Sequence, residues 1–309
     1  MPATRQITAE DVAGKLDWTT VIEALRQGHL GAGPQMDDLF LTREKDTLLN
    51  RAAWIPGLGV GLKTVTIMSG NRERGLPSVQ GVLIVFDEQT GTPEAIIDSA
   101  LVTHWKTAAD SGLGASYLAR PDSKRLVVLG AGKVAASLVE VYTTLFPELE
   151  EITIWSRTRA SAEALVEHLA DQHLPGHVCT DLAAAVGKAD IVASATMTHD
   201  PILQGDWVGP GTHVDLIGAY RADMREADDN LMRKGRVFVD SRESTVDHIG
   251  EIRIPIAEGV ITADDICGDL YELATGKAGR HADEEITVYK NGGGAHLDLM
   301  TAKAIMAAL

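Results

Sequence analysis

The second half of the chain alternates short, largely apolar runs with stretches of helical periodicity. From residue 126 onwards these runs are separated by amphipathic segments that are long enough for helices. Such alternation is typical of a parallel sheet whose strands are joined by helices. We therefore predict an α/β fold with a doubly wound parallel sheet. The predicted strands are 126–129, 151–155, 190–194, 212–217 and 236–240.

The first 120 residues have a different pattern. Apolar residues three or four positions apart predict a helix over 9–30. Strand-like segments follow, separated by turns rich in Gly, Pro and Asn, and a second helix is predicted over 102–118. This block is expected to be mainly antiparallel sheet. Its predicted strands are 47–54, 61–68, 78–87 and 94–98.

The end of the chain carries one more strand-like segment, 285–290, then the loop Asn291–Gly294 and a helix over 296–309. We expect this helix to join the N-terminal block. The expected domains are 1–120 together with 290–309, and 121–289. The first of them is therefore discontinuous.

The composition limits the classes of partner. The 309 residues carry a formal net charge of −16, which disfavours nucleic acid and anionic membranes because both bind basic faces. The two cysteines, Cys179 and Cys267, are far apart and lack metal-ligand spacing, so we expect neither a disulfide nor a metal site. The sequence has no signal-peptide pattern and no apolar run of membrane-spanning length. We expect a cytoplasmic protein.

A glycine-rich turn follows the first strand of the second domain. Its residues are Gly130-Ala131-Gly132-Lys133-Val134-Ala135, a Gly-x-Gly-x-x-Ala pattern between a strand and a helix. Gly130 permits a tight turn, Gly132 lets the backbone approach a pyrophosphate, and Ala135 keeps helix and strand close. Amides at the helix N-terminus then bind the pyrophosphate. We therefore expect 121–289 to be a Rossmann domain that binds a nicotinamide dinucleotide.

The end of the second strand of this domain indicates which dinucleotide is bound. NAD-specific sites carry Asp or Glu there, which hydrogen-bonds the ribose hydroxyls. This chain has Ser156-Arg157-Thr158, followed by Arg159. A guanidinium with two hydroxyls can hold a 2′-phosphate, so we expect NADPH, with NADH as the alternative. In the simpler interpretation, both arginines are ordinary surface residues at a helix start.

Lys63 lies in the middle of a strand-like segment, between apolar residues. Because burying an unpaired ammonium is prohibitive, a lysine at this position is either paired or functional. The alternative is a solvated lysine on an edge strand.

Several segments, taken in their order and spacing, resemble the ornithine cyclodeaminase/mu-crystallin family. The likeness extends over nearly the whole chain and includes the glycine turn. The other segments are Gly61-Leu62-Lys63-Thr64-Val65, Gly75-Leu76-Pro77-Ser78-Val79-Gln80-Gly81, Thr103-His104-Trp105-Lys106-Thr107-Ala108-Ala109, His213-Val214-Asp215-Leu216-Ile217-Gly218-Ala219-Tyr220 and Asn291-Gly292-Gly293-Gly294.

The resemblance implies a homodimer whose discontinuous α+β domain binds the substrate, a small imino, amino or keto acid. It implies that Lys63 lies at the substrate beside the nicotinamide, and that Gly293 belongs to a loop closing the site. Lys106 stands where the family usually has arginine, and a lysine offers a carboxylate only a point charge. Arg51 could supply a second cation, although it is equally well explained as a surface residue. Thr196 and Gly218 are expected at the cofactor.

Tyr220 separates two branches of the resemblance. Cyclodeaminases have an aspartate at this position, which binds the distal amino group of the substrate. A tyrosine hydroxyl is neutral at pH 7 and cannot balance an ammonium in that way. Together with the NADPH preference, Tyr220 favours the ketimine reductase branch. The tyrosine would either hydrogen-bond the ring nitrogen or form a wall of the pocket.

The resulting hypothesis is an NADPH-dependent oxidoreductase that reduces a cyclic ketimine carboxylate. The substrate would be Δ1-pyrroline-2-carboxylate or Δ1-piperideine-2-carboxylate, and the product L-proline or L-pipecolate. Lys63 and Tyr220 are the expected catalytic residues. The alternatives are a cyclodeaminase-like amino-acid deaminase with bound NAD, and a non-catalytic protein that holds nucleotide and ligand as mu-crystallin does.

Overall fold

The computed structural model describes residues 4–309, apart from the side chain of Arg72. The chain forms two compact units. The first comprises the described residues up to Ala109 together with Gly293–Leu309, and the second comprises Asp110–Gly292. The sequence placed the boundaries at residues 120 and 289. The observed first boundary falls inside helix α3 (Ser99–Leu118), so this helix contributes residues to both units.

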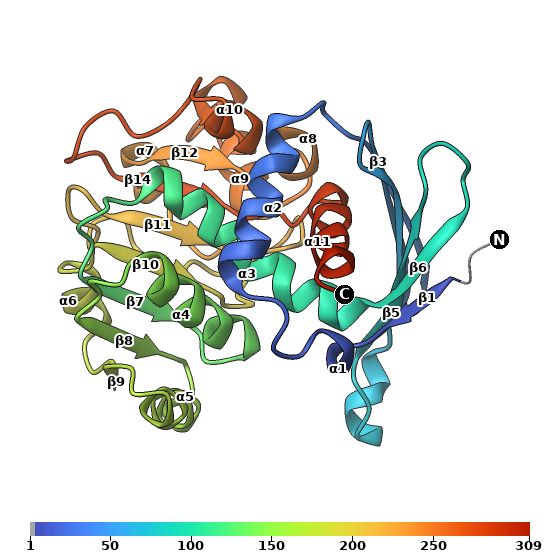
Figure 1. The fold of residues 1–309 in the computed structure, drawn as a ribbon. Helices are drawn as coiled ribbons and strands as arrows, with labels where there is room; N and C mark the ends of the chain where they lie inside the picture. The colour runs from blue at the N-terminus through green and yellow to red at the C-terminus, as the bar shows by residue number, and fades with distance from the viewer. Residues whose placement is uncertain (1–3) are drawn as a thin grey trace. The chain divides into compact units, whose positions relative to one another are not determined.

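The first unit is built on a six-stranded sheet (Figure 1). The sheet is antiparallel except for the parallel pair β1–β6, as expected of this block. The sequence interpretation missed both edge strands of this sheet. The strand β1 has only three residues, and β2 is almost wholly exposed and therefore lacks a buried apolar alternation. In sheet order the strands are β1 (Arg5–Ile7), β6 (Pro93–Asp98), β5 (Val79–Phe86), β4 (Gly59–Ile67), β3 (Asp46–Ile55) and β2 (Gln35–Arg43).

The single helix predicted over 9–30 is wrong. The structure has α1 (Ala9–Val12) and α2 (Trp18–Leu30) instead. The chain turns at Gly14, whose φ of 72° is unfavourable for other residues, and α2 starts afresh at the N-cap Asp17, which accepts a hydrogen bond from the Thr20 amide at 2.7 Å. Residues Ser69–Arg74 form a short 3₁₀ helix, η1.

The C-terminal helix α11 (Ala295–Ala307) is the core of the first unit. It packs against both α2 and the central strands, and Figure 1 shows it in red between α2 and the sheet. Two glycines make this close packing feasible. A Cβ on Gly61 would lie 3.2 Å from Leu299, and one on Gly28 would collide with Met300.

The second unit contains an eight-stranded, fully parallel sheet, which confirms the predicted fold class. The strands progress outward from β7 in one direction through β8 and β9, and in the other through β10 and β11. Ligands of such sheets bind at the carboxyl ends of the strands where the order reverses, here between β7 and β10. In sheet order the strands are β13 (Ile266–Gly268), β12 (Arg236–Val239), β14 (Thr287–Lys290), β11 (His213–Leu216), β10 (Ile191–Ser194), β7 (Arg125–Leu129), β8 (Glu151–Trp155) and β9 (Gly176–Val178).

The connections of this sheet are mostly helical, and apolar side chains from both strands and helices form its core. The helices are α4 (Lys133–Leu145), α5 (Arg159–Asp171), α6 (Leu182–Val186), α7 (Asp229–Lys234), α8 (Arg242–Thr245), α9 (Gly250–Ala257), η2 (Ala263–Asp265) and α10 (Leu270–Ala274). Among residues 4–309, no helix has both the length and the apolar composition needed to cross a bilayer.

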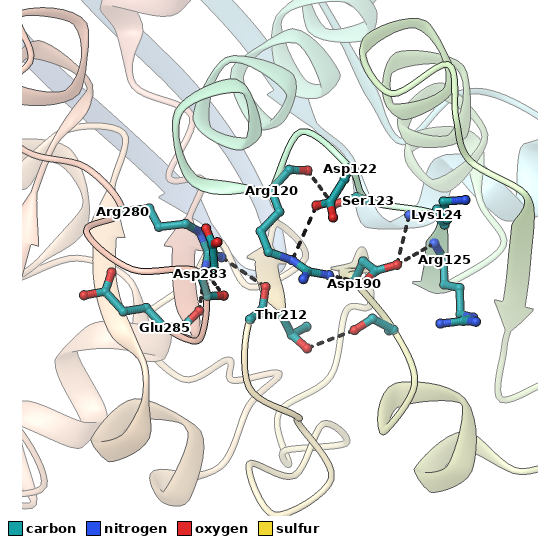
Figure 2. A network of polar contacts seen from close by, with 12 residues as sticks. Arg120, Asp122, Ser123, Lys124, Arg125, Asp190, Thr212, Arg280, Asp283 and Glu285 are labelled. Carbon is teal, nitrogen blue, oxygen red and sulfur yellow. Dashed lines mark hydrogen bonds and ion pairs between the residues drawn. The ribbon is translucent and has the colours of Figure 1, made fainter.

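A polar network fastens the amino-terminal edge of this sheet (Figure 2). Asp190, just before β10, pairs with Arg120 and accepts the backbone amides of Lys124 and Arg125 at 2.9 and 3.0 Å. Arg280 donates to the carbonyl of Leu118 at the end of α3, at 2.7 Å. These ionic contacts are structural, since ligands of doubly wound sheets bind at the opposite edge.

Candidate active site

Lys63 is buried near the middle of β4, an interior strand between β3 and β5. Its residue exposure is 6 %, and its ammonium donates to the hydroxyl of Thr103 at 2.7 Å and to Oδ1 of Asp298 at 3.0 Å. The ammonium is therefore paired, and the interpretation as a solvated lysine on an edge strand is wrong.

Lys106 and Arg51 converge on one carbonyl oxygen. Lys106, buried on α3, donates to the carbonyl of Gly293 at 2.8 Å, and Arg51 on β3 donates to the same oxygen at 2.7 Å. Arg51 also pairs with Asp38 on the neighbouring strand, at 2.6 Å. Gly293 has a φ of 70°, in the left-handed region where glycine is favoured, and this presents its carbonyl to both cations.

Asp298 joins this group, and the sequence interpretation missed it. The carboxylate lies on α11 with 1 % exposure, 3.0 Å from Lys63 and 3.5 Å from Lys106. Burial raises its pKa, but the charges of Lys106, Lys63 and Arg51 outweigh this and hold the pKa below its usual value. A signal was present, because Asp298 stands between Leu297 and Leu299 in a largely apolar helix. We call Arg51, Lys63, Lys106, Gly293 and Asp298 the cationic cluster.

The glycine turn of the second unit has the geometry that a dinucleotide requires. Gly130 has a φ of 118°, and a Cβ there would lie 2.8 Å from the carbonyl oxygen of Ala195. Gly132 is the N-cap of the 13-residue helix α4, and a Cβ on it would meet no atom within 4 Å. The backbone from Ala131 through Lys133 and Val134 thus opens the helix with space beside it. This fits a pyrophosphate on the helix N-terminus.

Ser156, Arg157 and Thr158 lie where the ribose of such a nucleotide is expected. They connect β8 to α5, at the carboxyl end of the strand next to β7. Ser156 is half-buried, whereas Arg157 and Thr158 are exposed. Arg159 forms an ion pair with Glu163 one turn along α5, at 2.8 Å. Arg157 is therefore the better candidate for a 2′-phosphate.

Thr196 and Gly218 follow the adjacent strands β10 and β11, and both are held by Glu226. Glu226 opens a short acidic segment, Glu226–Asp229, that leads into helix α7, but Glu226 does not cap this helix. Asp228 is the N-cap of α7, where its side chain accepts from the Leu231 amide. Glu226 itself is completely buried.

Tyr220 follows Gly218 and Ala219 in the loop after β11, and its side chain is 59 % exposed. The loop that carries it is anchored through the amides of Gly218 and Ala219, which donate to Glu226 at 2.5 and 3.2 Å. The ring is thus exposed, and the loop backbone that carries it is held in place. Its chemical role stays a prediction.

A doubly wound parallel sheet with a glycine turn at its switch point defines a dinucleotide-binding α/β protein. The model of the ornithine cyclodeaminase/mu-crystallin family matches residues 18–309. The chain belongs to this family, as the sequence motifs predicted.

Individual relatives indicate which members of the family this chain resembles. The chain is 55 % identical over 296 residues to a Δ1-pyrroline-2-carboxylate reductase of Paracoccus denitrificans, covering 96 % of this chain and 94 % of the relative. It superposes on the Thermococcus litoralis Δ1-pyrroline-2-carboxylate reductase in complex with NADH and L-proline, with a TM-score of 0.91, 28 % identity and coverage of 99 % and 97 %. An archaeal alanine dehydrogenase dimer with bound NAD gives a TM-score of 0.92, 29 % identity and coverage of 99 % and 95 %. These similarities confirm the prediction of a nicotinamide-dependent oxidoreductase of the ketimine reductase type.

Proposed function

We propose that this protein reduces Δ1-pyrroline-2-carboxylate to L-proline with NADPH, and accepts the six-membered Δ1-piperideine-2-carboxylate as well. The observation that carries the proposal is the cationic cluster, in a chain 55 % identical to a reductase of this substrate. Two lysines and an arginine around one carbonyl and one carboxylate form a site suited to a small organic anion.

The cluster supplies binding and orientation. Lys63 and Lys106 would hold the substrate carboxylate, with Arg51 as a third donor, and the contacts of Lys63 with Thr103 and Asp298 fix the direction of its ammonium. A protonated imine is already a good hydride acceptor, so positioning carries most of the rate enhancement. We propose that the hydroxyl of Tyr220 hydrogen-bonds the ring nitrogen.

The glycine turn, with Thr196 and Gly218, would bind the dinucleotide, which supplies the hydride when bound. We propose NADPH as the preferred form, because Arg157 and two hydroxyl groups follow β8 where an NAD-specific site has a carboxylate. NADH is the weaker alternative substrate.

We also propose a homodimer formed through the sheet of the first unit. Helix α11 packs on the face of β4 that carries Gly61. On the opposite face, Leu39, Leu41 and Trp54 are at least 50 % exposed. Exposed apolar side chains on one face of a sheet favour contact with a second copy of the same chain. Light scattering of the purified protein tests this, and a monomer mass would contradict it.

We propose a cytoplasmic location. Cys179 and Cys267 are both free, which is typical of proteins from a reducing compartment.

The activity is tested by NADPH oxidation with Δ1-pyrroline-2-carboxylate, followed by identification of the product. Pyruvate with ammonia tests an alanine dehydrogenase activity, and ornithine with NAD, assayed for ammonia release, tests a cyclodeaminase. The proposal predicts NADPH loss only with the imine, and one proline for each NADPH consumed. Ammonia release without net change in cofactor would contradict it.

A further inference from the structure

We infer that Glu226 is a positioning residue of the dinucleotide site, which clamps the loops after β10 and β11 at the switch point of the sheet. This inference rests on the proposed function, since it concerns the cofactor site of that activity.

The carboxylate of Glu226 makes five hydrogen bonds, and in all of them it is the acceptor. Oε1 accepts from the Ser194 hydroxyl at 2.6 Å and from the amide and hydroxyl of Thr196 at 2.8 and 2.7 Å. Oε2 accepts from the amides of Gly218 and Ala219 at 2.5 and 3.2 Å. One oxygen therefore serves the loop after β10, and the other serves the loop after β11.

The two loops depend on this clamp because their backbones approach each other very closely. A Cβ on Gly218 would collide with the backbone of Thr196. The loop after β10 in turn touches the glycine turn, because the carbonyl of Ala195 lies 2.8 Å from the Cβ position of Gly130. A shift of either loop would therefore change the space available at the cofactor turn.

The backbone of Glu226 is itself anchored by hydrogen bonds. Glu251, buried on α9, accepts from the backbone amides of Glu226 and Ala227 at 2.7 and 3.0 Å. The carbonyl of Glu226 accepts from the amides of Ile202 and Leu203, both at 2.9 Å. Backbone and side chain of Glu226 are thus both fixed, which is what a rigid support for a ligand-binding loop requires.

The decisive variant is Glu226→Gln. An amide has one acceptor oxygen, so in either orientation its NH₂ group faces backbone amide donors of one loop. That loop loses its acceptor, while the other loop stays anchored. We expect the Kd for NADPH to rise by about tenfold or more, as follows from losing hydrogen bonds to a charged group. The KM for the imine, measured at saturating NADPH, should change little.

The matched control is Asp190→Asn, at the other end of the same strand. Asp190 is also an acceptor-only carboxylate that holds two backbone amides, but it lies at the amino-terminal edge (Figure 2). This variant should lose stability and keep the Kd for NADPH. If Glu226→Gln fails to fold, Ser194→Ala removes a single hydroxyl donor and should raise the Kd by a few-fold.

An unchanged Kd in Glu226→Gln, or an equal rise in Glu226→Gln and Asp190→Asn, would overturn the inference. Because NADPH binding is measured without imine, the result is separate from the test of turnover. A wild-type protein that binds NADPH and does not reduce the imine would contradict the proposed function and leave the clamp standing.

Discussion

The ammonium of Lys63 and the carboxylate of Asp298 lie 3.0 Å apart, although 235 positions separate them in the chain. The strand β4 and the terminal helix α11 bring them together inside one unit. Both side chains are at most 8 % exposed. This pair couples the stability of the first unit to the charge of the proposed substrate site.

Replacing Asp298 by Asn should therefore destabilise the protein. Removing one partner of a buried ion pair leaves the other charge uncompensated, and this costs about 3–5 kcal/mol. Urea unfolding measures the loss. The control is Glu23→Gln, whose partner Arg26 lies one helical turn away at the surface, and it should leave the unfolding free energy almost unchanged. Equal stabilities of Asp298→Asn and wild type would show that the pair is dispensable.

The variant Lys63→Met should strongly impair reduction of the imine and leave NADPH binding intact. Methionine keeps the length of the side chain and removes the charge that we propose holds the substrate carboxylate. We expect kcat/KM for the imine to fall by about 30- to 5,000-fold, since a buried charged contact is worth about 2–5 kcal/mol. Lys15→Met, at an exposed lysine, is the control. Turnover at the wild-type rate in Lys63→Met would remove this lysine from the site.

Arg157 and Arg159 should differ in their effect on cofactor choice. Arg157→Ser should raise the Kd for NADPH by about 10- to 100-fold and spare NADH, because only NADPH carries the 2′-phosphate that we propose the guanidinium binds. Arg159→Ser should do little, since Arg159 pairs with Glu163. Fluorescence titration of both variants with NADPH and with NADH gives the four Kd values. A parallel loss of NADPH and NADH affinity in Arg157→Ser would disprove 2′-phosphate recognition.

Asp215 should make the stability of the protein depend on pH. Burial raises the pKa of Asp215 from 3.8 to about 7, against the hydrogen bonds from Tyr142 and Ser111 and the charge of Lys290. The folded state thus binds a proton more tightly than the unfolded chain. This contribution is fully present below about pH 4 and is lost as the pH rises towards 7, by at most about 1.4 kcal/mol per pH unit.

The variant Asp215→Asn has no proton to lose, so its stability relative to wild type should increase between pH 5 and pH 7. Urea unfolding across this range measures the difference. In Asp87→Asn the difference from wild type should stay constant over this interval, because hydrogen bonds from Thr90 lower the pKa of Asp87. Parallel stability curves for Asp215→Asn and wild type would contradict the assignment.

The sequence predicted those parts of the fold that depend on local pattern. The apolar runs identified the central strands of the parallel sheet, and the turn at Gly130 needs only neighbouring residues to be recognised. The edge strand β2 was missed because its exposed residues carry no burial pattern. The break near Gly14 was missed because apolar spacing continues across it.

The polar side of the candidate site was predicted less completely. The isolated lysine in β4 could be found because a cation among apolar residues needs an explanation. The lysine in the Thr-His-Trp-Lys motif was found because that motif resembles the family. Their shared partner Asp298 and the clamp Glu226 could not be assigned, because each acquires its role from residues distant in sequence. Periodicity shows that a charge is unusual, and only the tertiary structure identifies its partner.

We propose that the cationic cluster holds the carboxylate of the imine that is reduced. A comparison of two imines that differ only in this carboxylate tests the proposal directly. With NADPH saturating, kcat/KM for Δ1-pyrroline-2-carboxylate should exceed that for Δ1-pyrroline by about a hundredfold or more. The difference should largely disappear in Lys63→Met. Equal values for the two imines with the wild-type protein would show that the cationic cluster does not recognise the carboxylate.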